Sequence, residues 1–182
     1  MREIGFRPLG RDDLGLLDEW LRREHVRRWW DEHESYDDVA RHYLPAIEGR
    51  RPTDLYLILL DDRPVGFIQT YLVAGYPDFA ALVGLGAGVA GVDLFIGEEE
   101  LTGKGLGPEV LRAFVRDVVF AEAATTACIA DPDVRNAASI RAFEKAGFRR
   151  VGQFFDPNDG ELHAIVRLDR KGVGSSGAGS AP

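Results

Sequence analysis

The sequence has one cysteine and no long apolar run. Because Cys128 stands alone in a chain of 182 residues, no disulfide can form within the chain, and we expect a reducing compartment, the cytoplasm. No apolar run approaches the roughly 20 residues that cross a bilayer, and the charged first residues are not typical of a signal peptide. We therefore expect no membrane partner.

Basic side chains are fewer than acidic ones. The chain carries 22 lysines and arginines against 30 aspartates and glutamates, and its formal net charge is −8. A nucleic-acid-binding protein needs a basic face, so this balance argues against a nucleic-acid partner and weakly favours a cationic small molecule. We also expect no metal, because the four histidines show no spacing typical of metal ligands: His25, His33, His42 and His163.

The composition is that of one soluble domain. Hydrophobic residues make up 45% of the chain and charged residues 29%, which is ordinary for a globular protein. A chain of this length normally forms one domain and buries about 70% of its unfolded surface. We assign residues 1–170 to a single domain and residues 171–182, which are rich in glycine and serine, to a disordered tail.

Short apolar runs separated by turn residues predict two β-hairpins, 55–60 with 65–72 and 149–155 with 162–168. Residues 74–91, rich in glycine and alanine, are expected to form a long loop. The predicted order of elements is β-α-α-β-β-β-α-β-α-β-β. This order indicates an α/β fold in which helices flank a mixed sheet.

A glycine-rich turn, Leu101-Thr-Gly-Lys-Gly-Leu-Gly-Pro108, lies between a predicted strand and a predicted helix. Its alternating glycines allow unusual φ angles and a close approach of a ligand to the backbone. The free N–H groups at the start of the helix attract phosphate, and Lys104 adds a positive charge. A plain turn without a ligand explains this segment alone equally well. The phosphate-binding loop pattern and the dinucleotide pattern G-x-G-x-x-G are both absent from it.

A second motif, Asn136-Ala-Ala-Ser-Ile-Arg-Ala-Phe-Glu-Lys-Ala-Gly-Phe148, follows about thirty residues later. The turn and this motif together resemble the Gcn5-related N-acetyltransferase (GNAT) superfamily, over about residues 3–169. The resemblance implies a mostly antiparallel central sheet flanked by helices, with acetyl-CoA as co-substrate. It places the pyrophosphate on the backbone of 103–107 and the pantetheine arm at Asn136 and along 94–96. The implied cofactor-binding residues are Leu94, Phe95, Ile96, Thr102, Gly103, Lys104, Gly105, Leu106, Gly107, Asn136, Ser139 and Phe143.

Further motifs resemble the aminoglycoside 6′-N-acetyltransferases of this superfamily. They recur in order along nearly the whole chain and include Val26-Arg-Arg-Trp-Trp30, Pro64-Val-Gly-Phe-Ile-Gln-Thr-Tyr71 and Gly91-Val-Asp-Leu94. The implied activity is direct transfer of acetyl from acetyl-CoA to a primary amine of an aminoglycoside, which confers antibiotic resistance. The implied substrate-binding residues are Trp30, Gln69, Tyr71, Asp93 and Asp131.

Asp93 is the candidate catalytic base. It interrupts the apolar run Val92-Asp-Leu-Phe-Ile96, where a carboxylate is costly unless it is paired or points into a polar cleft. The attacked amine must lose a proton, which a nearby carboxylate can accept directly or through water. On the residues alone, Asp93 could instead end a strand on a solvated face, and Asp131, before Pro132, could start a turn. The resemblance favours the functional interpretations.

Three features depart from the family pattern. Thr102 replaces the usual glutamine or arginine, and Phe143 replaces a tyrosine whose hydroxyl is assigned in the family to protonate the leaving thiolate. Residues 80–88 also lack the acids of the resistance enzymes. Two alternatives therefore stay open: acetylation of another amine, such as a siderophore precursor or a protein N-terminus, and a non-catalytic acyl-CoA-binding sensor. The expected assembly is a monomer or a homodimer.

Overall fold

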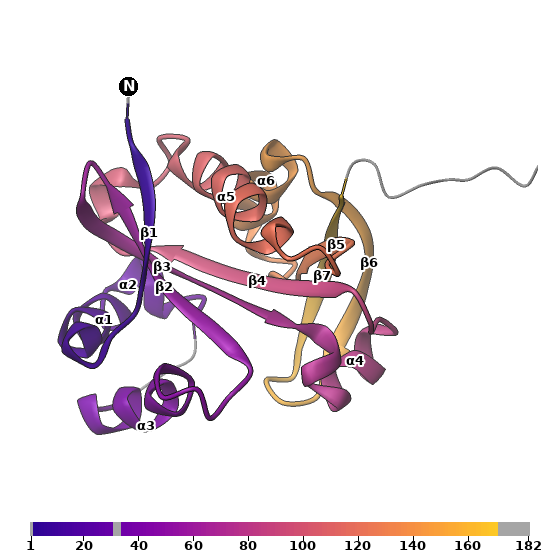
Figure 1. Ribbon diagram of the computed structural model, residues 1–182, viewed down its shortest axis with the longest axis horizontal. Helices are drawn as coiled ribbons and strands as arrows, with labels where there is room; N and C mark the ends of the chain where they lie inside the picture. The colour runs from indigo at the N-terminus through magenta and orange to yellow at the C-terminus, as the bar shows by residue number, and fades with distance from the viewer. Residues whose placement is uncertain (1, 31–33, 171–182) are drawn as a thin grey trace, which may run out of the picture.

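The computed structural model describes residues 2–30 and 34–170, and the predicted tail at 171–182 lies outside the described residues. Its strands form one sheet in the order β1-β2-β3-β4-β5-β7-β6 (Figure 1). Every neighbouring pair is antiparallel except β4 and β5, so the prediction of a mostly antiparallel sheet is confirmed. The strands are β1 (Ile4–Pro8), β2 (Thr53–Leu60), β3 (Arg63–Leu72), β4 (Val89–Ile96), β5 (Ala127–Ala130), β6 (Arg149–Asp156) and β7 (Glu161–Asp169).

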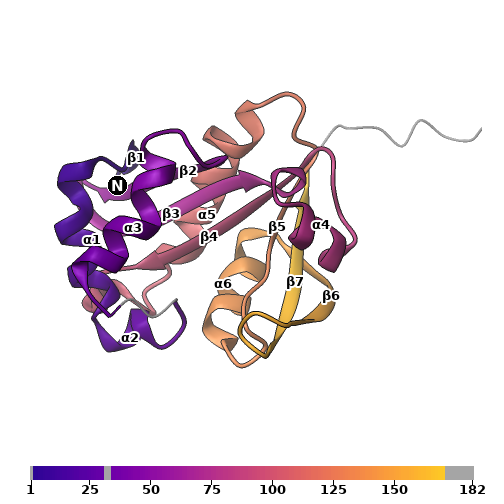
Figure 2. The ribbon, with the colours of Figure 1, turned by 90° about the horizontal axis from the view of Figure 1, so that it is seen from below.

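Helices cover both faces of this sheet. They are α1 (Leu14–Leu21), α2 (Glu24–Arg27), α3 (Tyr36–Ile47), α4 (Pro77–Val83), α5 (Leu106–Asp117) and α6 (Ala137–Ala146). Side chains of α1, α2 and α3 pack on one face, and those of α5 and α6 on the other. Figure 2 shows α4 at the end of the molecule opposite α1, where it contacts β6. None of the described helices is long and apolar enough to cross a bilayer.

The β2 strand shows how the sequence produces these two cores. Successive strand residues point to opposite faces, so Leu55 and Leu57 pack with α1 and α3, while Ile58 packs with α5. Leu57 and Ile58 are both fully buried. Burying each of these side chains stabilises the fold by about 1.5–3 kcal/mol. The near-continuous apolar run of β2 is therefore explained by helices on both sides of the strand.

Two helix starts are fixed by side chains that accept hydrogen bonds from the backbone. Ser35 Oγ accepts from the Asp38 N–H at 3.2 Å at the start of α3, and Asn136 Oδ1 accepts from the Ser139 N–H at 3.1 Å at the start of α6. Such caps supply acceptors for N–H groups that have no partner within the helix. Gly147 ends α6 with a φ of 105°, a left-handed conformation that glycine adopts without strain.

The prediction of a loop over 74–91 is wrong for most of that segment. The α4 helix occupies Pro77–Val83, and β4 already begins at Val89. Pro77 is the first residue of α4, where its missing N–H is no loss, and Gly84 ends the helix with a φ of 67°. The helix brings Phe79 and Val83 against the small apolar cluster around Val89.

β4 and β5 form the parallel pair, and they are joined over a short stretch. Only Val89–Gly91 of β4 is paired with Ala127–Ile129 of β5 in the described structure. β4 continues to Ile96 with β3 as its partner on the other side. Within the described ranges, residues 92–96 therefore have no partner strand on one edge of β4.

Candidate active site

Asp93 lies within β4 and is half-buried. Gln69, its direct neighbour on β3, donates a hydrogen bond from Nε2 to Asp93 Oδ2 over 2.9 Å. Because Phe95 faces the α1–α3 side of the sheet, strand alternation places Asp93 on that side as well. A neutral amide thus helps to hold this carboxylate in place.

Tyr71 lies on the same face of β3 as Gln69, two residues further along. Its ring lies across Gly91, its partner on β4: a Cβ built on that glycine would stand 2.3 Å from Tyr71 Cζ. Burial raises the pKa of the Tyr71 hydroxyl, and the charges of Asp93 and Asp131 raise it further. The phenol therefore stays protonated near neutral pH and can donate a hydrogen bond.

Cys128 of β5 is fully buried. Burial raises the pKa of its thiol, and the negative charge of Asp93 raises it further. Since the thiolate is the nucleophilic form of cysteine, this buried thiol is suited to packing in the core and not to nucleophilic attack.

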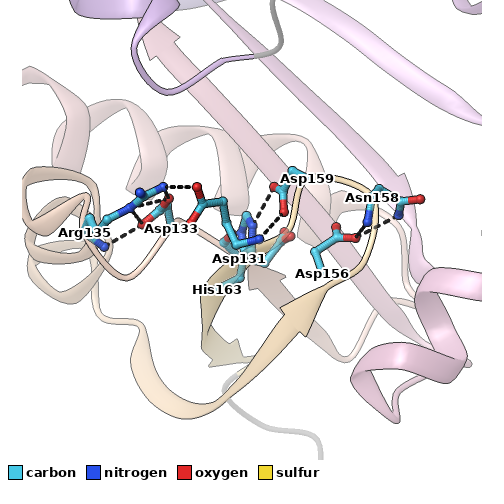
Figure 3. A network of polar contacts seen from close by, with 8 residues as sticks. Asp131, Asp133, Arg135, Asp156, Asn158, Asp159 and His163 are labelled. Carbon is cyan, nitrogen blue, oxygen red and sulfur yellow. Dashed lines mark hydrogen bonds and ion pairs between the residues drawn. The ribbon is translucent and has the colours of Figure 1, made fainter.

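Asp131 follows the last residue of β5, beside a polar network shown in Figure 3. Burial raises the pKa of its carboxyl to about 7, and the charge of Asp93 adds to the shift. The Asp131 carbonyl accepts a hydrogen bond from His163 Nδ1 at 2.7 Å, and Asp159 Oδ2 lies 2.8 Å from His163 Nε2. Burial alone lowers the pKa of His163, but these two partners outweigh it and the net shift is upward. The carboxylates of Asp93 and Asp131 are thus close enough for the charge of one to act on the other.

A cavity of about 280 Å³ opens on the α1–α3 side of the sheet, beside Asp93. Its lining includes the predicted residues Gln69 and Tyr71, but neither Trp30 nor Asp131. Trp30 packs edge-on against Phe67 and Phe95, with centroids 5.8 and 5.0 Å away, and donates a hydrogen bond to the Tyr43 hydroxyl at 2.9 Å. The described lining residues are His42, Tyr43, Ala46, Arg51, Thr53, Leu55, Gln69, Tyr71, Tyr76, Phe79 and Asp93.

Sequence reasoning missed eight of these eleven lining residues, namely those from α3, β2 and α4 and those just before β2 and α4. Two signals for them are visible in the sequence. The alternation in β2 puts Thr53 on the same face as Leu55. Pro77 and Gly84 are typical first and last positions of a helix, which would have placed Phe79 on an ordered element. Nothing in the sequence brings Tyr76 to Thr53, whose hydroxyls form a hydrogen bond.

The glycine-rich turn has the backbone that a phosphate group needs. Gly103 and Gly105 have φ angles of 69° and 84°, and a Cβ on either would meet no atom within 4 Å. α5 begins directly afterwards, at Leu106, so its first N–H groups point out of the helix end beside this open turn. Thr102 cannot replace the missing glutamine or arginine, because its hydroxyl donates to the Glu99 carbonyl at 2.7 Å.

The other predicted cofactor residues lie around the open edge of β4. Leu94 and Ile96 are half-buried on the α5 side, whereas Phe95 is buried on the opposite side. Leu106 is buried, so it offers only its backbone, while Lys104 and Gly107 stay at the surface or half-buried. Asn136 caps α6 and accepts a hydrogen bond from the Ser139 N–H in the first turn of that helix. Phe143 is buried against Phe148, with ring centroids 5.1 Å apart.

Comparison with known proteins identifies the family. The model of the acetyltransferase (GNAT) domain matches residues 10–155. The chain belongs to the GNAT acetyltransferases. This acetyltransferase is 32% identical over 165 residues to the aminoglycoside N(6′)-acetyltransferase type 1 of Klebsiella pneumoniae, which covers 89% of this chain and 82% of the relative. It is 29% identical to the lysine N-acyltransferase MbtK of Mycolicibacterium paratuberculosis over 86% of this chain and 69% of that protein.

Solved structures agree with this assignment. AAC(6′)-Ib in complex with coenzyme A superposes on the acetyltransferase with a TM-score of 0.79 and 29% identity, covering 92% of this chain and 95% of that one. An uncharacterised protein from Bacillus halodurans gives a TM-score of 0.83 at 26% identity, with 92% and 84% covered. Acetyl-CoA is the acetyl donor of this enzyme, an N-acetyltransferase.

Gly105→Ala tests the predicted cofactor turn of the acetyltransferase. We expect the KM for acetyl-CoA to rise about tenfold, because alanine at a left-handed position costs about 1–2 kcal/mol and shifts the N–H groups of the turn. The kcat at saturating acetyl-CoA should change little. The matched control is Gly160→Ala, which has a φ of 76°, equally open surroundings and a place in the β6–β7 turn. Equal KM values for the two variants would contradict the assignment.

Asp131→Asn tests the charge of the site through stability. The pKa of Asp131 in the folded protein is raised to about 7, so the folded state holds this proton more tightly than the unfolded chain does. The stability gained from this difference is present at pH 4 and is lost as the pH rises to 7. The variant does not titrate there, so its melting temperature should exceed that of wild type by about 3 °C or more at pH 8 and by less at pH 5. Asp133→Asn is the control, because Arg135 lowers the pKa of Asp133 and its loss should destabilise at pH 8. An Asp131→Asn variant with the same gain at both pH values would refute the buried charge.

Proposed function

We propose that this enzyme is an aminoglycoside 6′-N-acetyltransferase, located in the cytoplasm, where acetyl-CoA is available, and able to confer antibiotic resistance. One observation carries the proposal: Asp93 stands, held by Gln69, at the junction of the aromatic cavity and the open edge of β4. An amine in the cavity and a thioester along that edge would meet at this carboxylate. The name of the Klebsiella relative and the kanamycin complex of AAC(6′)-Ib support an aminoglycoside as the amine.

The cavity suits an ammonium-bearing sugar. Tyr71, Tyr76 and Phe79 present aromatic surface, which attracts cations through the ring faces. Asp93 supplies a carboxylate at the wall, and Asp131 adds negative potential close by. Together they would concentrate a cationic amine at the point of reaction.

In the proposed reaction, the substrate ammonium first gives one proton to the Asp93 carboxylate, directly or through water. The nitrogen lone pair then attacks the thioester carbonyl carbon, so that a C–N bond forms and the C–S bond breaks. Sulfur leaves with the bonding electrons as the CoA thiolate. The second proton of the acetylated nitrogen passes to the thiolate, and the proton on Asp93 returns to solvent. Holding both reactants in one complex would lower the entropic cost of bringing them together.

The leaving sulfur receives its proton without a tyrosine. Phe143 has no hydroxyl and is buried against Phe148, so we assign this proton transfer to water or to the Ser139 hydroxyl at the start of α6. A thiol is acidic enough to depart as thiolate, since free thiols have a pKa of about 8.5. Turnover therefore does not depend on a dedicated acid.

Thiol release from acetyl-CoA tests the proposed function. With kanamycin or tobramycin as acceptor, we expect a rate well above the amine-free background, and mass spectrometry should show one added acetyl group on the 6′-amine. No release with any aminoglycoside would overturn the proposal. Release with a peptide N-terminus alone would favour another amine, and acetyl-CoA binding without release from any amine would favour the sensor. Higher inhibitory concentrations in a susceptible host expressing the chain would establish resistance.

A further inference from the structure

The charges around the acceptor cavity are unusual for a site that binds a polycation. Among the lining residues in the described ranges, Asp93 is the one carboxylate and Arg51 the one arginine, and no lysine is present. A fixed positive charge in the wall repels additional ammonium groups of a substrate. A negatively charged ligand group, in contrast, would be attracted to Arg51.

The guanidinium group of Arg51 is available to bind a ligand. Within residues 2–30 and 34–170, its guanidinium makes neither an ion pair nor a side-chain hydrogen bond, although its backbone N–H is held by the Pro45 carbonyl at 3.2 Å. Its neighbour Arg50 differs, because Arg50 Nε donates to Glu48 Oε2 at 2.9 Å. A planar guanidinium with five N–H donors matches a carboxylate in a two-bond arrangement. The anchored backbone and exposed side chain present this group at the rim of the cavity.

Arg51 comes before the first residue of β2, whereas Asp93 lies in a row with the interior of that strand. Asp93 lies opposite Gln69, and Gln69 lies opposite Leu55, so these residues form one row across β4, β3 and β2. The next row on this face joins Gly91, Tyr71 and Thr53, and Arg51 comes two residues before Thr53, outside the strand. The aromatic side chains of Tyr71 and Tyr76 line the space between the two charged ends.

We propose that Arg51 binds a carboxylate of the acyl acceptor, so that this cavity also accepts amines bearing a carboxylate at the end remote from the reacting nitrogen. This proposal rests on the acetyl transfer proposed at Asp93. Amines that bear a carboxylate would react by the same steps, with the same bonds formed and broken and the same proton transfers. An α-blocked lysine has this chemistry: a primary amine, an apolar chain and a carboxylate. Its ammonium faces Asp93 and its carboxylate faces Arg51.

Two matched acceptors test the proposal, Nα-acetyl-lysine and its neutral amide, which differ only at the carboxylate. Wild-type enzyme should show a kcat/KM about tenfold higher for the acid, the effect of one charge-assisted contact. Arg51→Gln should bring the two values within about twofold, mainly through KM, and Arg51→Lys should restore part of the preference. Arg50→Gln is the control and should keep the wild-type ratio. Arg51→Gln should also lower the KM for kanamycin, because a repulsive charge is removed.

The outcomes separate this proposal from the proposed function. Turnover of kanamycin without any preference for the acid over the amide overturns the role of Arg51 and leaves the aminoglycoside activity standing. A preference for the acid that disappears in Arg51→Gln, without turnover of kanamycin, supports the role of Arg51 and overturns the aminoglycoside activity. A preference that persists in Arg51→Gln overturns the proposal. Unchanged melting temperatures of the variants show that folding does not explain the result.

Discussion

Replacing Asp93 with asparagine is expected to lower kcat/KM for the acyl acceptor by about 10²–10³ at pH 7. The amide keeps the size of the carboxylate and an oxygen that can accept the hydrogen bond from Gln69, but it cannot take a proton from the ammonium. The variant therefore depends on the fraction of amine that is already neutral. Its kcat/KM should climb with pH, and the deficit against wild type should shrink between pH 7 and 9 in a thiol-release assay.

Asp54→Asn is the matched control for this experiment. Asp54 stands on β2 between Thr53 and Leu55, which both line the cavity, and it is exposed on the other face. Its loss should leave both kcat/KM and the pH profile unchanged. A deficit of Asp93→Asn that is constant with pH and lies wholly in KM would show that Asp93 binds the substrate without acting as its base.

Gly91→Ala should damage both stability and substrate binding. The added Cβ would stand 2.3 Å from Tyr71 Cζ and 2.7 Å from its hydroxyl oxygen, far inside contact distance, so the ring must move. Overpacking of this kind costs about 1–3 kcal/mol, which corresponds to a fall in melting temperature of about 3–10 °C for a chain of this size. Because Tyr71 lines the cavity, the KM for the amine should rise at least fivefold, measured at saturating acetyl-CoA.

Two further variants test whether the clash with Tyr71 explains the expected effect of Gly91→Ala. Gly86→Ala adds a methyl group just before β4 where no atom lies within 4 Å, and it should be neutral. Combining Gly91→Ala with Tyr71→Leu removes the clash, so the melting temperature should recover while the KM for the amine stays high. A single Gly91→Ala variant as stable as wild type would show that the Tyr71 ring does not need this glycine.

The parts of the fold that depend on neighbouring residues could be predicted from the sequence. Both hairpins were predicted, because apolar runs, a short polar turn and the next run lie within about 20 residues of each other. The helix caps at Asn136 and Gly147 also depend on residues that are close in sequence. The glycine-rich turn between β4 and α5 lies where it was predicted, and its chemistry stays a prediction that Gly105→Ala can test.

The cavity could not be assembled in this way. Its wall joins α3, β2, β3, β4 and the segment before α4, which are distant in sequence and meet only through the sheet order and register. An aromatic pair such as Trp29-Trp30 likewise does not reveal which ring faces a ligand. In the structure Trp29 is exposed under Arg28, and Trp30 supports Tyr43 from behind. Which of the two rings is buried depends on tertiary packing, which a local sequence pattern does not show.

The sheet has two parts, β1 to β4 and β5 to β7 (the two plates below). In the described structure they are connected by the three residue pairs between β4 and β5. A molecule bound along the free edge of β4 and at the start of α6 would touch both plates at once. Its binding energy would then add to the cohesion between the plates, as any ligand specific for the folded state raises stability. Acetyl-CoA bound at this predicted site would therefore link the two parts of the sheet.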